Sequence, residues 1–219
     1  MPLYGANSMS GKMTRVTAAA IDSILEFWFD GEPETQQQLE RLTRKWFASS
    51  QAEDDDSERR FGGLAAAAAS GELDAWSATP RGRLALIILL DQLPRSIHRG
   101  TQAAFAQDPK ALMLCLEGLE QNQHLELGPL EQLFFCMPLQ HAENREIQQQ
   151  SVATFGLLAK SETVAPVSAI LRQAVESAAE HRTIVDRFGR FPHRNEVLGR
   201  RSTADELEYL AAGAKRYGQ

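Results

Sequence analysis

The 219-residue chain is long enough to bury most of its apolar surface in one domain without disulfide or metal cross-links. Its formal net charge of −6 argues against general nucleic-acid binding, which requires a basic face to neutralise phosphates. No apolar run approaches the roughly 20 residues that span a bilayer. We therefore expect a soluble protein that binds neither nucleic acid nor membranes.

The N-terminal residues are polar and lack the apolar core of a secretory signal, so residues 1–14 are expected to form a disordered extension. Residues 15–219 are expected to form one domain. The two cysteines, Cys115 and Cys136, stand among apolar residues and form no close pair in the sequence. Because buried, reduced cysteines are typical of a reducing compartment, we expect a cytoplasmic location.

Apolar residues recur at helical spacing along most of the chain, and no run alternates strictly as a β-strand would. The first predicted helix ends near residues 30–31, and the second carries an apolar stripe over residues 39–47. A third starts at the acidic run 54–56, which is expected to be solvated, and ends near Gly71. These patterns predict the all-α class.

Thr79 and Pro80 form a favourable helix start, with the threonine as cap and the proline in the first turn. The helix that follows is apolar on every side over residues 84–90, so we expect it at the centre of the fold. Ser202 and Asp205 have the spacing of a capping box for the last helix. The helices between are predicted at about 108–119, 128–138, 142–159 and 164–188, which makes about nine helices in a single domain.

Residues 181–195, with the sequence HRTIVDRFGRFPHRN, are the densest polar stretch of the chain. They combine two histidines, four arginines, an aspartate and an asparagine with two phenylalanines. A ligand pocket has this character, because apolar walls exclude water while a few polar groups orient the ligand. Six arginines against two acidic residues give residues 181–201 a formal charge of +4, against −10 for the rest of the chain. A basic patch on an acidic protein favours a specific small anion over a polyanion.

His181 falls on the buried stripe of the helix predicted at 164–188. It is therefore either a hydrogen-bonded core histidine or an acid, base or ligand that faces a pocket. Gly189 is expected to end this helix, and Pro192 is expected to turn the chain sharply. The three polar residues after Pro192 should then return toward the same end of the helix.

Two further regions hold candidate polar groups. Asp91 directly follows the most buried helix, where an unpaired carboxylate would be costly, so it requires a partner. Arg95 is the near choice, and an arginine or histidine of residues 181–195 is the alternative. In residues 138–143, a break at Pro138 followed by a helix start would offer free backbone N–H groups to an anion.

Recognised catalytic and metal-binding motifs do not account for these residues. The histidines and carboxylates are scattered, and none has a ligand spacing such as HExxH. The chain also contains no nucleophile elbow and no phosphate-binding loop. We therefore predict neither a metal nor a cofactor.

Three segments resemble the signature segments of the bacterial "domain of unknown function 924" family. They are LLDQLPRSIHRGT with AFAQD in residues 89–108, MPLQHAE in 137–143 and HRTIVDRFGRFPHRN in 181–195. The resemblance covers nearly the whole chain from about residue 20. It implies an all-α, tetratricopeptide-like fold with helices stacked as antiparallel pairs, and it implies no settled activity. Since these segments coincide with the three polar regions, we expect them to form one composite pocket.

Three functions fit this prediction. The first is a module whose arginines and Asn195 bind a small anion or the carboxylate of a peptide. The second is an enzyme that acts on an anionic substrate through a histidine and an aspartate as acid and base. The third is a structural Arg–Asp–His network in a protein that acts through its surface.

The candidate residues divide by expected role. The candidate catalytic residues are His181, His193, Asp91 and Asp186. The candidate ligand-binding residues are Arg95, His98, Arg99, His141, Glu143, Arg187, Arg190, Arg194 and Asn195. The sequence leaves the oligomeric state open.

Overall fold

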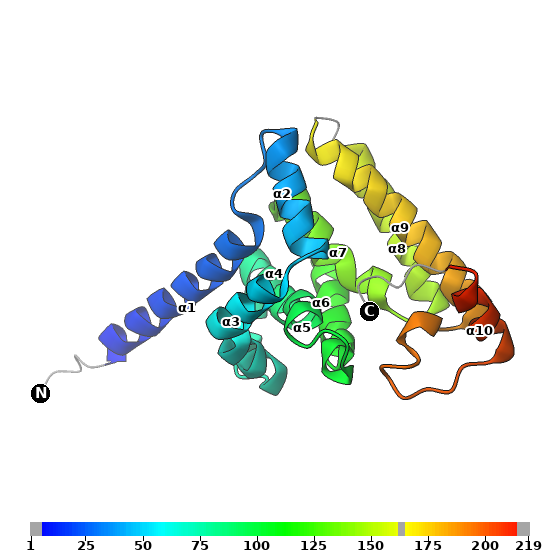
Figure 1. Ribbon diagram of the computed structural model, residues 1–219. Helices are drawn as coiled ribbons and strands as arrows, with labels where there is room; N and C mark the ends of the chain where they lie inside the picture. Colours follow the sequence, from blue (N-terminus) through cyan, green and yellow to red (C-terminus); the bar gives the residue numbers. More distant parts are fainter. Residues whose placement is uncertain (1–5, 162–164, 214–219) are drawn as a thin grey trace, which may run out of the picture.

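The computed structural model describes residues 6–161 and 165–213, with side chains from residue 17 onward. Over these ranges the chain forms α-helices, short 3-10 turns and one π turn, and it forms no strand. Figure 1 shows the helices packed directly on one another. The predicted all-α class is confirmed.

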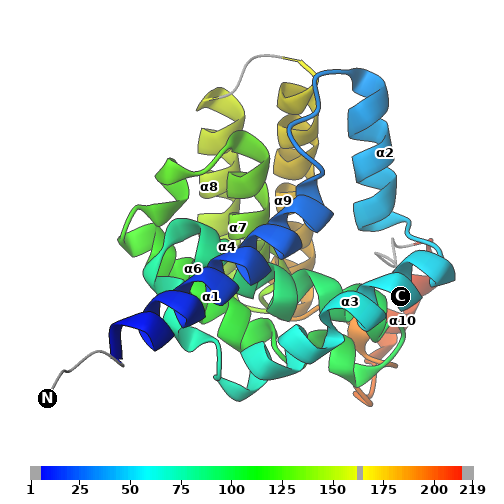
Figure 2. The same ribbon diagram turned by 90° about the vertical axis from the view of Figure 1, so that its left-hand side faces the viewer.

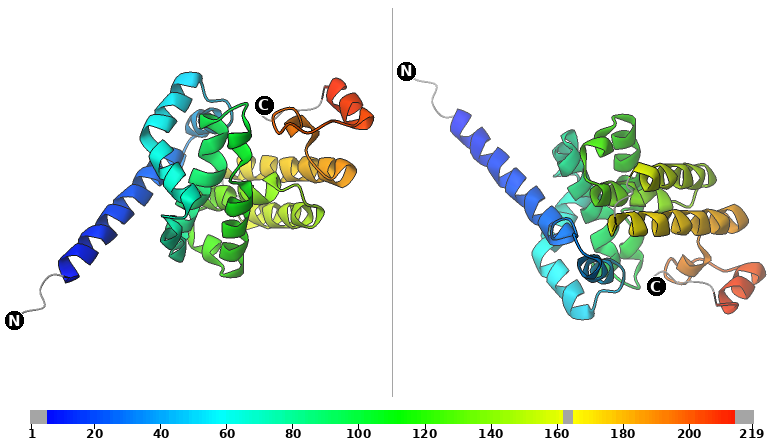
Figure 3. Two further views of the ribbon diagram at one scale, coloured as in Figure 1. Left: turned by 90° about the horizontal axis from the view of Figure 1, so that it is seen from below. Right: turned by 90° about the horizontal axis from the view of Figure 1, so that it is seen from above.

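The first three helices are α1 (Ala6–Phe29), α2 (Gln36–Phe47) and α3 (Gln51–Ser70). The last turns of α1 are buried in the core, whereas toward its N-terminus α1 extends away from the other helices (Figures 1 and 3). Because α1 begins at Ala6, residues 6–14, which we expected in a disordered extension, are helical. Residues 1–5 of that prediction lie outside the described residues.

Asp54, in the first turn of α3, corrects the expectation of a solvated acidic run. Its side chain is 5% exposed, because Arg99 Nη2 lies 3.0 Å from its carboxylate and Ser49 Oγ donates to it at 2.7 Å. A buried carboxylate requires such partners. Local sequence does not reveal the charged partner, since Arg99 is 45 positions away.

The central element is a continuous helical rod over residues 80–97. Thr79 caps its first part, α4 (Pro80–Ile87), as predicted, and accepts a hydrogen bond from Gly82 N. The rod then passes through a π turn (Ile88–Gln92) into α5 (Leu93–Ile97). Residues 84–90 are completely buried, which confirms their predicted central position. The π turn, a local widening of the helix that is frequent at functional sites, was not predicted.

Two helices that pack on the rod are α6 (Asp108–Glu120) and α7 (Pro129–His141). The predicted end of α7 at Pro138 is wrong, because the helix continues to His141. Every residue from 133 to 140 is buried, so packing holds the helix together across the proline. Gln148 Nε2 donates to carbonyls at the C-terminal end of α7 and caps it there.

The C-terminal part begins with α8 (Arg145–Ser161) and α9 (Val167–Phe188), which lie side by side as an antiparallel pair (Figures 2 and 3). Gly189 ends α9 with a left-handed φ of 71°, as predicted. α10 (Ala204–Ala211) follows, and its capping box uses Thr203 and Glu206, one residue later than expected.

Counted with the rod as one helix, the described residues hold nine α-helices. The 3-10 turns are Asp74–Ala78, Gln102–Phe105, Gln123–Glu126 and Pro192–Arg194. Among the described residues, no helix is long and apolar enough to cross a bilayer. The tetratricopeptide-like stacking stays a prediction.

Candidate functional site

A cavity of about 400 Å³ lies between α2, the end of the rod, α7, α9 and the Pro192–Arg194 turn. Its wall combines apolar and polar side chains. The apolar part includes Trp46, Phe47, Phe105, Leu133, Met137 and Ile170, and the polar part includes Arg95, Arg99, His141, His181, His193 and Arg194. All three polar regions selected from the sequence therefore contribute to one cavity.

Asp91 lies behind the polar part of this wall, on the π turn, and is completely buried. His141 Nδ1 lies 2.7 Å from Asp91 Oδ1, and Arg95 Nη2 donates to the same oxygen at 3.0 Å. Gln92 Nε2 donates to the other oxygen. Burial alone would raise the pKa of Asp91, but His141 and Arg95 hold this pKa below its ordinary value. Asp91 is therefore an ionised, fully bonded carboxylate.

His141 is the last residue of α7, and its side chain is 13% exposed. Burial and the charge of Arg95 lower the pKa of His141. Asp91 acts in the opposite direction, but the net effect is a lowered pKa. The ring is therefore neutral near pH 7 and donates its Nδ1–H to Asp91. Among the described residues nothing hydrogen-bonds Nε2. His141 thus presents an acceptor nitrogen to the cavity that it lines.

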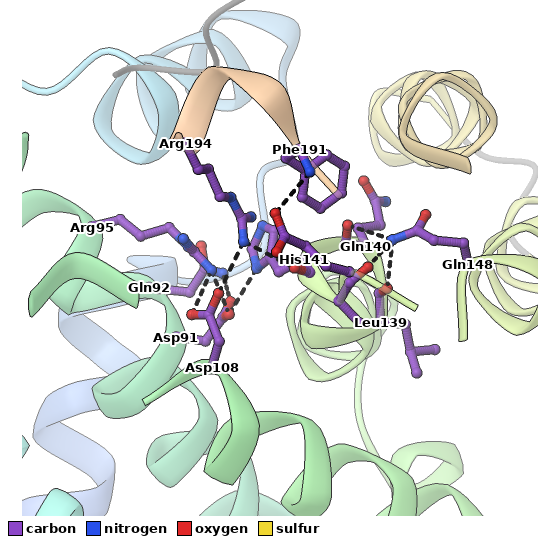
Figure 4. Close-up of polar contacts among 12 residues, drawn as sticks. Asp91, Gln92, Arg95, Asp108, Leu139, Gln140, His141, Gln148, Phe191 and Arg194 are labelled. Carbon is purple, nitrogen blue, oxygen red and sulfur yellow. Dashed lines mark hydrogen bonds and ion pairs between the residues drawn. The ribbon is translucent and has the colours of Figure 1, made fainter. Parts of the chain in front are cut away.

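Arg95 and Arg194 converge on Asp108 from two sides (Figure 4). Arg95 Nη2 donates to Asp108 Oδ1 at 2.8 Å, and Arg194 Nη1 donates to Asp108 Oδ2 at 3.3 Å. Arg194 Nη1 also donates to the His141 carbonyl at 3.1 Å. The ring of Phe105 lies against both guanidinium groups, with its centroid 5.2 Å from Arg95 Cζ and 4.8 Å from Arg194 Cζ. The two cations are held in fixed positions as a result.

Both arginines keep donors that no described residue uses. The hydrogen bonds of Arg194 to other side chains and carbonyls come from Nη1, and those of Arg95 come from Nη2. The Nε atoms of both are buried without an acceptor among the described residues. Burial and the neighbouring Arg95 lower the pKa of Arg194 to about 10, so it remains charged near pH 7. Arg95 Nη1 and Arg194 Nη2 also form no hydrogen bond with a described residue, and both arginines line the cavity. The cavity wall therefore holds charged donors that the described residues leave unused.

His181 and His193 also line the cavity, but the aspartates that we expected to pair with them, Asp91 and Asp186, have other partners among the described residues. His181 Nδ1 lies 2.7 Å from the Ser177 carbonyl of its own helix, and its ring packs edge-on against Phe191. Burial lowers the pKa of His181 to about 4 and that of His193 to about 3. Both rings are neutral near pH 7. The histidine that Asp91 pairs with is His141, which we had assigned to ligand binding.

Several predicted site residues lie outside the cavity wall. Asp186 is half-exposed and pairs with Arg182, and Arg187 pairs with Asp205 at the surface. His98 is exposed. The structure does not bring these three residues to the cavity.

Glu143, Arg190 and Asn195 form a separate network beside the cavity. Arg200 contacts both carboxylate oxygens of Glu143, at 2.5 and 2.9 Å. Arg190 contacts both oxygens of Glu206, at 2.6 and 2.8 Å, and Asn195 also donates to Glu206. This network holds the segment after α9 against α10. For Arg190 and Asn195, which belong to residues 181–195, the role is therefore structural, as in the third of the three hypotheses.

Sequence reasoning missed Asp108 as a site residue. An aspartate followed by proline is typical of a helix N-terminus, and residue 108 was predicted only as the start of the helix at about 108–119. Among the described residues, no group of three or more histidine, cysteine or acidic side chains could hold a metal ion.

The family described as "Bacterial protein of unknown function (DUF924)" has a model that matches residues 24–214. The chain belongs to the DUF924 family. This DUF924 chain is also similar to a solved structure from Agrobacterium tumefaciens, that of the protein of unknown function ATU0120. The two are 35% identical, with a TM-score of 0.74 over 90% of this chain and 99% of the other. Comparison with curated proteins finds no match.

Proposed function

We propose that this DUF924 chain binds a small organic anion, such as a carboxylic acid or the carboxylate of a peptide, between Arg95 and Arg194. The observation that carries the proposal is that Arg95 Nη1 and Arg194 Nη2, in two residues that line the cavity, donate to no described residue. Planar donors of this kind match the two oxygens of a carboxylate. His141 and the nearby apolar side chains complete the wall.

The charges around the cavity favour a ligand with a single negative charge. Three arginines in the wall are each paired with a buried or half-buried aspartate. These are Arg95, Arg99 and Arg194, against Asp54, Asp91 and Asp108. The set is formally neutral, and the histidines of the wall are neutral near pH 7. A dianion such as phosphate would therefore bring two uncompensated charges into the cavity, whereas a carboxylate brings one, which the charged hydrogen bonds offset more readily.

The test is the melting temperature of the protein with acetate, benzoate, succinate, phosphate or a short peptide at millimolar concentration. Monocarboxylates should raise it in a concentration-dependent way, because a ligand that binds only the folded state stabilises it. Arg194→Lys keeps the charge but loses the fork of donors, so it should weaken binding about tenfold. Arg187→Lys, at an exposed site outside the cavity, is the matched control. The absence of any shift with all five probes would reject the proposal.

The pairing of His141 with Asp91 favours acid–base catalysis on an anionic substrate as a second candidate function. The carboxylate fixes the Nδ1–H tautomer, which leaves Nε2 as a base at the cavity. A screen of carboxylates that carry an ester or amide bond elsewhere in the molecule would look for turnover. His141→Gln should then lower the rate about a hundredfold or more. His98→Gln is the control, and equal loss in both variants would reject a role for His141.

We also propose a cytoplasmic location. Cys115 and Cys136 are both free and buried, and burial raises the pKa of both thiols, that of Cys136 to about 12. Such cysteines suit a reducing compartment. Fractionation of cells that express the tagged chain is the test.

A further inference from the structure

The cavity changes from apolar to polar along two of its helices. On α7 the lining residues proceed from Leu133 and Met137 to Gln140 and His141, and on α9 from Ile170 to His181. At a helical rise of about 1.5 Å per residue, Leu133 and His141 are separated by about 12 Å. The cavity is therefore elongated, with the arginines and His141 at one end.

We infer that the ligand is a monocarboxylate with an unbranched apolar tail of medium length, the carboxylate at Arg95 and Arg194 and the tail at the apolar end. This inference rests on the proposed anion-binding function. A short anion would fill only the polar end, leaving in contact with water the apolar surfaces that are exposed in the rest of the cavity, chiefly that of Phe47. A tail that covers them removes this apolar surface from water and adds to the affinity.

The apolar end continues toward the solvent between α2 and α9. A second, more open cavity of about 440 Å³ lies there, and it shares Thr43, Phe47, Ile170 and Gln173 with the first. Phe47 is 52% exposed although it is a large apolar residue. An exposed aromatic at the mouth of an apolar cavity is typical of a surface that a ligand covers. A tail too long for the first cavity would therefore extend into the second cavity, toward the solvent.

The experiment is a titration with straight-chain acids from acetate to decanoate, each kept below its micelle concentration. Trp46 lines the cavity, so tryptophan fluorescence reports occupancy, and calorimetry supplies the affinity. Affinity should rise about three- to fourfold for each added methylene until the apolar end is filled. Octanol, with a tail but no charge, should bind more weakly than octanoate.

Phe47→Ser tests the apolar end without disturbing a buried residue. It should weaken decanoate binding severalfold and leave acetate binding unchanged. Leu125→Ser is the matched control, because Leu125 is 64% exposed and does not line either cavity. Circular dichroism and the melting temperature verify that both variants fold.

The outcomes separate the two proposals. If no acid binds even at millimolar concentration, the proposed function fails. If short and long acids bind equally well, anion binding stands and the apolar tail is rejected. Tighter binding of a peptide that ends in leucine than of octanoate would also reject the inference, since the ligand would then be a peptide terminus.

Discussion

Arg194 Nη1 lies 3.3 Å from Asp108 Oδ2, although 86 positions separate the two residues in the chain. The same atom donates to the His141 carbonyl at 3.1 Å. Asp108, His141 and Arg194 each belong to a different one of the three segments that resemble the DUF924 signature. One buried side chain therefore joins all three segments at the cavity (Figure 4).

Loss of the Arg194 guanidinium should destabilise the fold. Arg194→Leu leaves Asp108 with one buried partner fewer, and removing one member of a buried pair costs about 3 kcal/mol. Urea denaturation measures the free energy of unfolding. Arg182→Leu, which breaks an exposed pair with Asp186, should change it by about 0.5 kcal/mol or less. Equal effects in the two variants would contradict a stabilising role for the Arg194 pair.

The fold should lose stability as the pH falls from about 6.5 toward 4. Burial lowers the pKa of His181 to about 4 and that of His193 to about 3, from an ordinary value of 6.5. Between these values the unfolded chain binds protons that the folded chain does not. The free energy of unfolding therefore falls by about 1.4 kcal/mol per pH unit for each histidine. Stability from these neutral rings is present above pH 6.5 and is lost on acidification.

The His181→Gln variant tests this pH dependence. Urea denaturation at several pH values should give a shallower decrease between pH 6.5 and 4 than in the parent protein, because one titrating group is gone. His98→Gln, which removes an exposed histidine outside the cavity, is the matched control. A parent-like slope in His181→Gln would show that His181 does not titrate in this range.

Gly118 allows α6 to approach α7 and the rod closely. A Cβ at this position would meet Phe135 Cζ at 2.4 Å and Arg83 Cδ at 2.6 Å. We expect Gly118→Ala to destabilise the protein by about 1–3 kcal/mol through overpacking, as urea denaturation would measure. Gly156→Ala, in α8, meets nothing within 4 Å and should stabilise slightly through helix propensity. A stabilising Gly118→Ala would refute the close approach.

The two cysteines should be inert in the folded protein. Burial raises the pKa of Cys115 well above its ordinary value and that of Cys136 to about 12, so neither forms the reactive thiolate near pH 7. A thiol reagent should label neither cysteine until urea unfolds the protein, and then it should label both. Rapid labelling of one thiol in native buffer would show that its surroundings open readily.

Local patterns predicted most of the helices and failed where packing or distant charges intervened. The start at Thr79, the buried run 84–90 and the end at Gly189 depend on capping, periodicity and φ, which neighbouring residues express directly. Pro138 did not end α7, because buried packing outweighed the lost hydrogen bond. Asp54 is buried because Arg99, far along the chain, compensates its charge.

The sequence by itself determined the helical class, the central apolar helix and the three polar segments, since these follow from composition and from spacing within one helix. Only the tertiary structure decided which charges pair. Asp91 pairs with His141 and Arg95, Arg194 reaches Asp108, and Glu143 is bound by Arg200 away from the cavity. A buried charge is compensated by whichever partner packing brings within hydrogen-bond distance, and that distance is set by helices whose order in space the local pattern does not encode.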